Sequence, residues 1–363
     1  MRIGCVSDVC LGYGSPQIGY LVESLAEHYG AETLVAEPSV RHLAPRHNVF
    51  PGLRIRRAHT VFDPYSAAGR SEYVLAAAAM MDEWEPDLLV ICCTFSLPVL
   101  FKLRKPPAYV IYYCYESVAH YGEFDVEMNG HLKGRLDVIL FPEENRAALE
   151  VSRFRFGDVP TLVLYNCPRR TTRPPLPKQM RNGRFIYAGM IDREDTFADY
   201  YVNPLVGAHP IDLFGPIRAA KDEDRTSWLS KLPKRVQYCG HIAGGDLAEL
   251  RRHYIYSLVM WNPRTENQHY AAPNKFFESI ADGVPPLSAP HPQCKKLIDR
   301  YQCGVLTSDW SEAGLLVGLD HARKLFATSE WDSMLANCQS AFAGELNWER
   351  QFEKLKVHLT KQP

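Results

Sequence analysis

Short apolar runs alternate with helical segments along most of the chain, and this alternation limits the possible folds more than any other feature. Residues 1–7 are apolar, residues 12–16 form a glycine turn, and residues 17–28 carry apolar side chains at helical spacing before a second apolar run begins at 32–36. A strand, a helix and another strand in this order form a βαβ unit with parallel strands. The pattern predicts an α/β fold built on parallel sheets.

The alternation runs through the first half of the chain and then starts again. In the first half, further strands are predicted at 86–93, 108–113, 136–141 and 163–168. In the second half, strands are predicted at 185–189, 211–216, 236–241, 257–261 and 304–306. Two sets of alternating strands and helices indicate two Rossmann-like, doubly wound domains.

A segment rich in proline and arginine separates the two sets. Residues 168–177 contain four prolines and no acidic residue, which is typical of an exposed linker. We therefore expect an N-terminal domain at 1–168, a linker at 169–182 and a C-terminal domain at 183–340. The closing segment, 341–363, carries an amphipathic helix.

Composition excludes several classes of protein. A chain of 363 residues with 46% hydrophobic residues can bury two cores, and a net charge of −1 does not favour nucleic-acid binding. Ten cysteines without a C-x-x-C pair, and no secretory signal, favour reduced thiols in a cytoplasmic protein. No metal site is expected, because the histidines lack zinc spacing and the D-x-D at 222–224 lies in a polar, helix-like stretch.

The stretch at 271–285 carries the clearest chemistry. Pro273 suits the first position of a helix of about three turns that Gly283 ends. Lys275 would add a full charge to the positive end of the helix dipole, and Glu278 would lie on the same face. This pair could bind a nucleoside diphosphate, the cation on the diphosphate and the carboxylate on the ribose. The alternative is an ordinary surface ion pair.

The same stretch resembles a known family. PNKFFESIADGVP is similar to the P-N-K-x-x-E-x-x-A-x-G-x-P signature of the group 1 nucleotide-sugar glycosyltransferases. The resemblance implies the GT-B fold, in which two Rossmann-like domains face each other across a cleft and the terminal helix, here in 341–363, crosses back to the first domain. It also implies that Asn274, Lys275 and Glu278 bind the donor. Many members carry a further glutamate where this chain has Tyr270, so Tyr270 must serve the donor differently.

Other segments extend the resemblance over the second half. YAGMIDRED, at 187–195, is similar to the phosphate turn of the family, which implies that Gly189 and Arg193 lie at the donor diphosphate. Arginine forks bind two phosphate oxygens at once, whereas the alternative for Arg193 is a salt bridge to a neighbouring acid. LFGP at 213–216 and the segment 236–263 also resemble the family.

Candidate residues of the first half are fewer. Gly12 and Gly14 follow the first strand and either let the backbone approach the donor or make a tight turn. Glu116 and His120 follow the strand at 108–113, at the sheet edge where ligands of such folds bind, and are candidate catalytic groups facing the acceptor. Surface solvation explains them equally well. If the resemblance holds, Gly12 and Gly14 should face Arg193, Lys275 and Glu278 across the cleft.

The resemblance implies a glycosyltransferase that moves a sugar from a nucleoside diphosphate donor to a glycan or lipid-linked acceptor, with retention and without a metal or other cofactor. A cytoplasmic location is expected, with weak contact at the inner membrane surface as an option. Five arginines could make that contact, although a solvated loop is the simpler interpretation: Arg41, Arg46, Arg54, Arg56 and Arg57. The alternatives are an inactive nucleotide-sugar-binding partner or sensor, which Tyr270 favours, and an epimerase that would need Glu116.

Overall fold

The chain folds into two compact units. The computed structural model describes residues 1–363 apart from 119–130, 155, 157, 219–221, 243 and 360–363. One unit comprises Met1–Tyr165 and Gln351–Pro363, and the other comprises Asn166–Arg350. Each is built on a parallel sheet with helices, which confirms the predicted α/β class.

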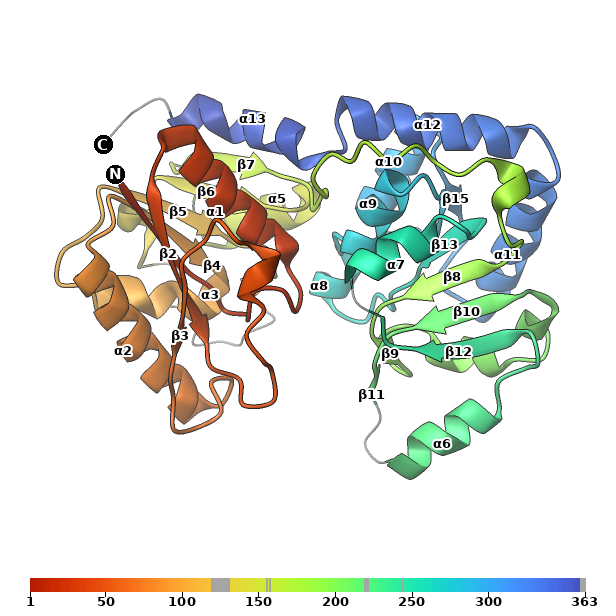
Figure 1. The fold of residues 1–363 in the computed structure, drawn as a ribbon, viewed down its shortest axis with the longest axis horizontal. Coiled ribbons are helices and arrows are strands. Elements are labelled where there is room, and N and C mark those ends of the chain that lie inside the picture. The colour runs from red at the N-terminus through yellow and green to blue at the C-terminus, as the bar shows by residue number, and fades with distance from the viewer. Residues whose placement is uncertain (119–130, 155, 157, 219–221, 243, 360–363) are drawn as a thin grey trace. The chain divides into compact units, whose positions relative to one another are not determined.

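The first unit contains a seven-stranded sheet in the order β3-β2-β1-β4-β5-β6-β7 (Figure 1). Its strands are β1 (Arg2–Val6), β2 (Glu32–Pro38), β3 (Ile55–Ala58), β4 (Leu88–Cys92), β5 (Tyr109–Tyr113), β6 (Val138–Phe141) and β7 (Thr161–Val163). Every neighbouring pair is parallel. The strand order reverses between β1 and β4, and the carboxyl ends of the strands at such a reversal are where open α/β sheets bind ligands.

Helices and short 3₁₀ turns connect these strands. They are α1 (Pro16–Tyr29), η1 (His47–Val49), α2 (Ala67–Trp84), α3 (Cys93–Ser96), η2 (Leu97–Phe101), η4 (Lys133–Arg135), α5 (Glu144–Phe154) and, from the end of the chain, α13 (Trp348–Leu359). Tyr73 and Met81 of α2 join a core with Val6 of β1. Tyr29 of α1 donates a hydrogen bond to the carbonyl of Leu359, 2.9 Å away, which holds the end of α13 in this unit.

The second unit repeats the same topology with six strands in the order β12-β10-β8-β13-β14-β15. They are β8 (Phe185–Ala188), β10 (Ile211–Phe214), β12 (Val236–Gly240), β13 (Tyr256–Val259), β14 (Pro286–Ser288) and β15 (Val305–Leu306), and a separate pair joins β9 (Ile191–Asp192) to β11 (Ile217–Arg218). All these pairs are parallel. Here the strand order reverses between β8 and β13.

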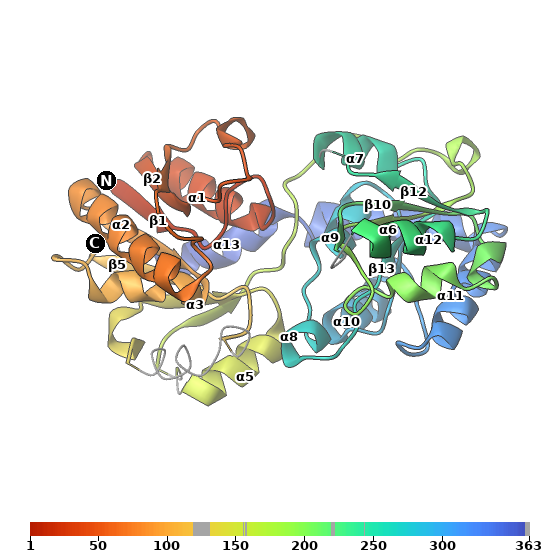
Figure 2. The same ribbon diagram turned by 90° about the horizontal axis from the view of Figure 1, so that it is seen from below.

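Helices pack on both faces of this second sheet (Figure 2). The described helices and 3₁₀ turns of this unit are η5 (Lys178–Met180), η6 (Ala198–Val202), η7 (Val206–Ala208), α6 (Asp222–Ser230), α7 (Gly244–Arg251), α8 (Glu266–His269), α9 (Asn274–Ala281), α10 (Pro292–Tyr301), α11 (Glu312–Phe326) and α12 (Glu330–Gly344). Side chains of a strand alternate between faces, so Phe185 and Tyr187 of β8 join the core with α11 and α12, whereas Ile186 and Ala188 pack near α7.

The helix expected at 271–285 is shorter than predicted. It begins at Asn274, with Pro273 as the residue before its first turn, and ends at Ala281. Eight residues make about two turns instead of three. The helix stops because Gly283 adopts a φ of 67°, a left-handed conformation that glycine tolerates.

Some strand predictions were also wrong. The arginine-rich segment expected to be a loop contains β3, and β14 was missed because Pro285 and Pro286 were interpreted only as a stop signal. The strand expected at 163–168 ends at Val163. In the closing segment, the predicted helix begins later, at Trp348, where the Asn347 side chain accepts a hydrogen bond from the Arg350 amide.

Candidate functional site

The side chain of Lys275 is the most unusual polar group of the second unit. It lies in the first turn of α9, and its residue is only 8% exposed. Its Nζ atom lies 4.1 Å from the ring centroid of Tyr187, the residue before the end of β8, and 5.0 Å from that of Trp261, just after β13. The ammonium group therefore lies at the carboxyl ends of the two strands between which the strand order reverses.

This ammonium group has no hydrogen-bond partner among the described residues. The pKa of Lys275 is lowered to about 7, chiefly by burial; the charge of Glu278 acts to raise it, and the charge of Arg251 acts to lower it. Burying a charged amine without an acceptor is unfavourable, and contact with two aromatic faces offsets only part of this. The surface ion pair with Glu278, considered above as the alternative, is wrong because Lys275 is buried. An anion at this place would supply the missing partner.

Two glycines make room for the ammonium group. Gly189 follows β8 with a φ of 151°, and a Cβ atom there would lie 2.8 Å from the Lys275 Nζ atom. Gly215 follows β10 with a φ of 135°, and its Cβ would lie 1.8 Å from the Gly189 carbonyl oxygen. Both positions require glycine, for backbone conformation and for space. The sequence predicted a role for Gly189 but none for Gly215.

Glu278 lies in the same helix and is held from the side by Arg251, the last residue of α7. The Arg251 Nη2 atom donates to the Glu278 Oε2 atom at 2.9 Å, and its Nη1 atom donates to the Asp282 Oδ2 atom at 2.5 Å. Arg251 is 2% exposed, whereas the Glu278 side chain is 35% exposed. Glu278 thus presents a fixed, partly open carboxylate on the helix that also carries Lys275. Sequence reasoning missed Arg251, because no motif marks it.

Arg193 does not have the surroundings expected of a buried phosphate ligand. Its side chain is 65% exposed, and its Nε atom donates to Asp199 at 2.8 Å. The predicted alternative, a salt bridge to an acidic neighbour, is therefore present, although the partner is neither Glu194 nor Asp195. Arg193 would have to leave Asp199 to reach a diphosphate.

The remaining second-unit candidates lie next to Lys275 in sequence. Tyr270 follows α8, a short helix that Thr265 begins with a capping box, and its ring meets that of His269 edge to face at 4.7 Å. Asn274 is the first residue of α9. Asn274 thus lies in the first turn of α9, and Tyr270 lies in the segment that leads into it.

The first-unit candidates have structural surroundings of their own. Gly12 has a φ of 86°, and a Cβ there would lie 2.9 Å from the Cβ of Arg46, whereas Gly14 has open space around it. Glu116, 38% exposed, lies 3.8 Å from the guanidinium of the buried Arg146. His120 lies outside the described residues.

Sequence reasoning missed one buried acid of the first unit. Asp8 follows β1 at the reversal of strand order, is 5% exposed and accepts a hydrogen bond from the Tyr115 hydroxyl. A polar residue directly after a buried strand was the available signal. Because the Tyr115 hydroxyl already engages its side chain and the Tyr65 hydroxyl its carbonyl, Asp8 contributes to the structure of this edge.

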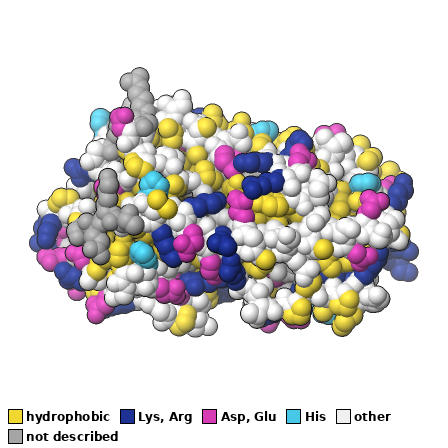
Figure 3. Space-filling view, turned by 90° about the horizontal axis from the view of Figure 1, so that it is seen from above, with side chains coloured by type: hydrophobic (Ala, Val, Ile, Leu, Met, Phe, Trp, Pro, Cys, Tyr) yellow, Lys and Arg dark blue, Asp and Glu magenta, His cyan; other side chains and the backbone are white. Residues whose placement is uncertain are grey.

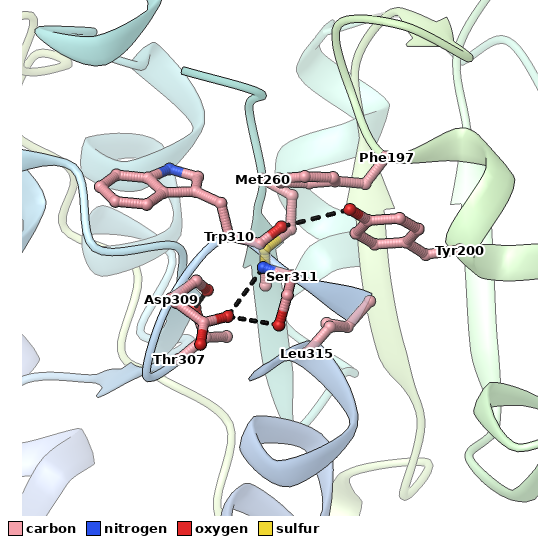
Figure 4. A pocket seen from close by; sticks show the side chains of 8 residues that line it. All are labelled: Phe197, Tyr200, Met260, Thr307, Asp309, Trp310, Ser311 and Leu315. Atoms are coloured by element: carbon pink, nitrogen blue, oxygen red, sulfur yellow. Dashed lines mark hydrogen bonds between the residues drawn. The ribbon is translucent and has the colours of Figure 1, made fainter. Parts of the chain in front are cut away.

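Figure 4 shows a hollow in the second unit, and the side chains that line it leave no space for a water molecule between them. It lies between η6 and the loop after β15, where the Tyr200 hydroxyl donates to the Trp310 carbonyl at 3.3 Å. Asp309 accepts from the backbone and hydroxyl of Ser311 in the same loop. We assign no ligand to it.

No group of three or more His, Cys, Asp or Glu side chains among the described residues could hold a metal ion. Within the same residues, no helix combines the length and apolar character needed to cross a bilayer.

Comparison with known proteins gives matches only at the level of structure. Neither a protein-family model nor a curated protein matches the sequence. Sucrose-phosphate synthase from Thermosynechococcus elongatus matches with a TM-score of 0.74 at 14% identity, over 99% of this chain and 98% of that one. HepE from Anabaena, solved with UDP-glucose, matches with a TM-score of 0.71 at 13% identity, over 100% of both chains.

A third similar structure is the apo form of the lipopolysaccharide outer core galactosyltransferase WaaB, with a TM-score of 0.68 at 13% identity over 99% of both chains. At such identities the likeness concerns the fold. These proteins are GT-B glycosyltransferases, and the strand orders of both units agree with that architecture. The chain therefore has the GT-B fold.

Proposed function

We propose that this protein is a glycosyltransferase that takes a sugar from a nucleoside diphosphate donor and transfers it to a glycan or lipid-linked acceptor. The observation that carries the proposal is the buried ammonium group of Lys275 at the carboxyl ends of β8 and β13, which has no hydrogen-bond partner in the described part of the chain. Glu278, one turn further along α9, supplies a partly exposed carboxylate. A cation for the diphosphate and an acceptor for ribose hydroxyls are the two groups that such a donor requires.

The chemistry follows from where charge develops. Breaking the bond between the sugar and the diphosphate leaves negative charge on the departing phosphate oxygens. Lys275 and the positive end of the dipole of α9 would stabilise that charge. We assign no metal to this step, and we propose retention of configuration because of the resemblance to the group 1 enzymes.

Similar structures support a nucleotide-sugar ligand. HepE was solved with UDP and with UDP-glucose, and TarM from S. aureus was solved with UDP. The face shown in Figure 3 carries Lys and Arg side chains interspersed with Asp and Glu, which gives no support to nucleic-acid binding. Glu116 in the first unit remains a candidate for meeting the acceptor.

The proposed location is the cytoplasm, with at most weak contact at a membrane surface. The loop arginines that might have met lipid headgroups already have partners inside the first unit. Arg57 donates to the buried Glu37 at 2.9 Å, and the Arg46 guanidinium lies 4.1 Å from the ring centroid of Tyr13. These contacts favour the interpretation of this segment as structural.

A turnover assay with UDP-sugars and GDP-sugars tests the proposal. Replacing Lys275 by methionine should lower transfer, or slow donor hydrolysis, by about 10²-fold at saturating donor, since one stabilising group at a developing charge contributes about 3 kcal/mol. Lys295→Met is the matched control, because Lys295 is exposed on α10 and paired with Asp299. Unchanged turnover of Lys275→Met would refute the assignment.

The second candidate function is a nucleotide-sugar-binding partner or sensor without catalysis. Tyr270 favours it, because this tyrosine stands where many group 1 enzymes carry a glutamate. Calorimetry and the same assay separate the two functions: a sensor would bind UDP or GDP and show neither transfer nor hydrolysis with any sugar tested.

A further inference from the structure

The contact between Arg251 and α9 has a geometry that suits a role in ligand binding. Arg251 ends α7, is 2% exposed and reaches two carboxylates through different guanidinium nitrogens: that of Glu278 in α9 and that of Asp282, the residue directly after α9. The two acids are four residues apart and therefore lie on the same helix face, where like charges repel. Arg251 lies between them and offsets that repulsion.

The two carboxylates differ in what else they can do. The Asp282 side chain is 13% exposed, and burial raises its pKa to about 6, which Arg251 counteracts. The Glu278 side chain is 35% exposed, and only its Oε2 atom accepts a hydrogen bond from the described residues. Its Oε1 atom is therefore available to a ligand, while Arg251 fixes the orientation of the carboxylate plane.

We propose that Arg251 is the positioning residue of the nucleotide site: it holds the Glu278 side chain oriented so that the carboxylate accepts hydrogen bonds from the two ribose hydroxyls of the donor. This inference rests on the proposed function. It also assigns Asp282 the task of anchoring the other arm of the guanidinium. A lysine could not replace Arg251 fully, because a single ammonium group lacks the planar fork that meets two carboxylates at once.

A purely structural role would be to tie α7 to α9, and it makes a different prediction. Loss of a structural tie would weaken the binding of every ligand of the site to a similar degree. Loss of a positioning residue for Glu278 would weaken the binding only of ligands that carry ribose hydroxyls. Nucleotides without these hydroxyls therefore distinguish the two roles.

The test compares UDP and GDP with their 2′,3′-dideoxy counterparts by calorimetry on the full-length protein. Wild type should bind UDP and GDP more tightly than their dideoxy forms. Arg251→Met should remove that preference by lowering the affinity for UDP or GDP about tenfold, which corresponds to about 1.4 kcal/mol of binding free energy. The affinity of Arg251→Met for the dideoxy nucleotides should differ from that of wild type by less than about twofold. Arg252→Met is the matched control, because the guanidinium of the neighbouring Arg252 bonds Glu249 and the Pro174 carbonyl.

The outcomes separate this inference from the proposed function. An equal loss for ribose and dideoxy ligands in Arg251→Met would show a structural tie and overturn the inference. If Arg251→Met does not fold, Arg251→Lys gives the same comparison, with a partial loss of ribose preference expected and an unchanged preference overturning it. If wild type binds neither UDP nor GDP, or if Glu278→Gln leaves the ribose preference intact, the proposed donor site itself is wrong.

Discussion

Lys275 combines burial with the lack of a hydrogen-bond partner among the described residues, and this combination is unfavourable in the protein alone. The Tyr187 and Trp261 rings contribute about 1–2 kcal/mol through their π-electrons, whereas moving an ammonium group out of water costs several kcal/mol. The difference is reflected in the pKa of Lys275, which burial lowers to about 7. A bound anion would reverse that balance.

The lowered pKa predicts how nucleotide binding depends on pH. Below pH 7 Lys275 is already charged, so a diphosphate binds without changing its protonation. Above pH 7 the free protein holds Lys275 neutral, and binding must add a proton. The affinity for UDP or GDP should therefore fall as pH rises above 7, and at pH 8 binding should take up about 0.9 proton.

Calorimetry at pH 8 in buffers of different ionisation enthalpy measures this uptake. Lys275→Met is the control, because any proton exchange of the nucleotide itself persists in that variant while the contribution of Lys275 disappears. Equal proton uptake in wild type and Lys275→Met would contradict the assignment of the anion site to this ammonium group.

The sequence pointed to Lys275 and Glu278 because local rules place both on one helix near its positive end. It could not predict the aromatic surroundings of Lys275 or the Arg251 contact, since Tyr187, Trp261 and Arg251 are distant in sequence and meet α9 only through the tertiary fold. Arg193 illustrates the converse: a suitable residue type in a suitable turn lies exposed and paired with Asp199.

At the scale of elements, the ends of β8 and β10 create the space that Lys275 occupies. Gly189 and Gly215 bring the two strand ends so close that no side chain fits between them. The Gly189 amide also donates to the Phe214 carbonyl at 2.9 Å, which fixes the distance between the strand ends. The position of the ammonium group is therefore determined by the backbone.

Replacing Gly189 by alanine should displace Lys275. The new Cβ would lie 2.8 Å from the Nζ atom, and a φ of 151° is unfavourable for alanine. We expect at least about a tenfold loss of UDP or GDP affinity, because the charged contact is worth about 1.5–3 kcal/mol. Calorimetry measures the affinity, and thermal denaturation reports the accompanying strain.

Gly344→Ala is a suitable control for this variant, because Gly344 ends α12 with no atom within 4 Å of an added Cβ. It should bind nucleotide like wild type. If Gly189→Ala also bound nucleotide like wild type, the glycine would not be shaping the site.

Elements with a strong period were predicted well, and elements with conflicting local signals were not. In the first unit, the apolar runs at 86–93, 108–113 and 136–141 predicted β4, β5 and β6, and the helical spacing of apolar residues predicted α1. β14 was not predicted because it begins at Pro286, and proline usually argues against a strand. β3 escaped because Arg56 and Arg57 made a partly buried edge strand look like a solvated loop.

At the scale of the whole molecule, two sheets with corresponding strand orders explain why the pattern of the sequence starts twice. In the described part of the chain, six strands of the first sheet have a counterpart in the second sheet, and β7 has none. The proposed donor site lies entirely within the second unit, since Gly189, Arg251, Lys275 and Glu278 all belong to Asn166–Arg350. The fold class was thus predictable from periodicity, whereas the detailed site required the structure.

The central claim is that the buried ammonium group of Lys275 binds the diphosphate of a nucleotide. The most direct test is a calorimetric titration of the full-length protein and its Lys275→Met variant with UDP and GDP at pH 7, together with thermal denaturation of both without ligand. We predict that Lys275→Met loses about 10- to 100-fold in affinity. We also predict that its free form is no less stable than wild type, because a buried unpaired charge has been removed. Equal affinity of the two proteins for the nucleotide would contradict this account.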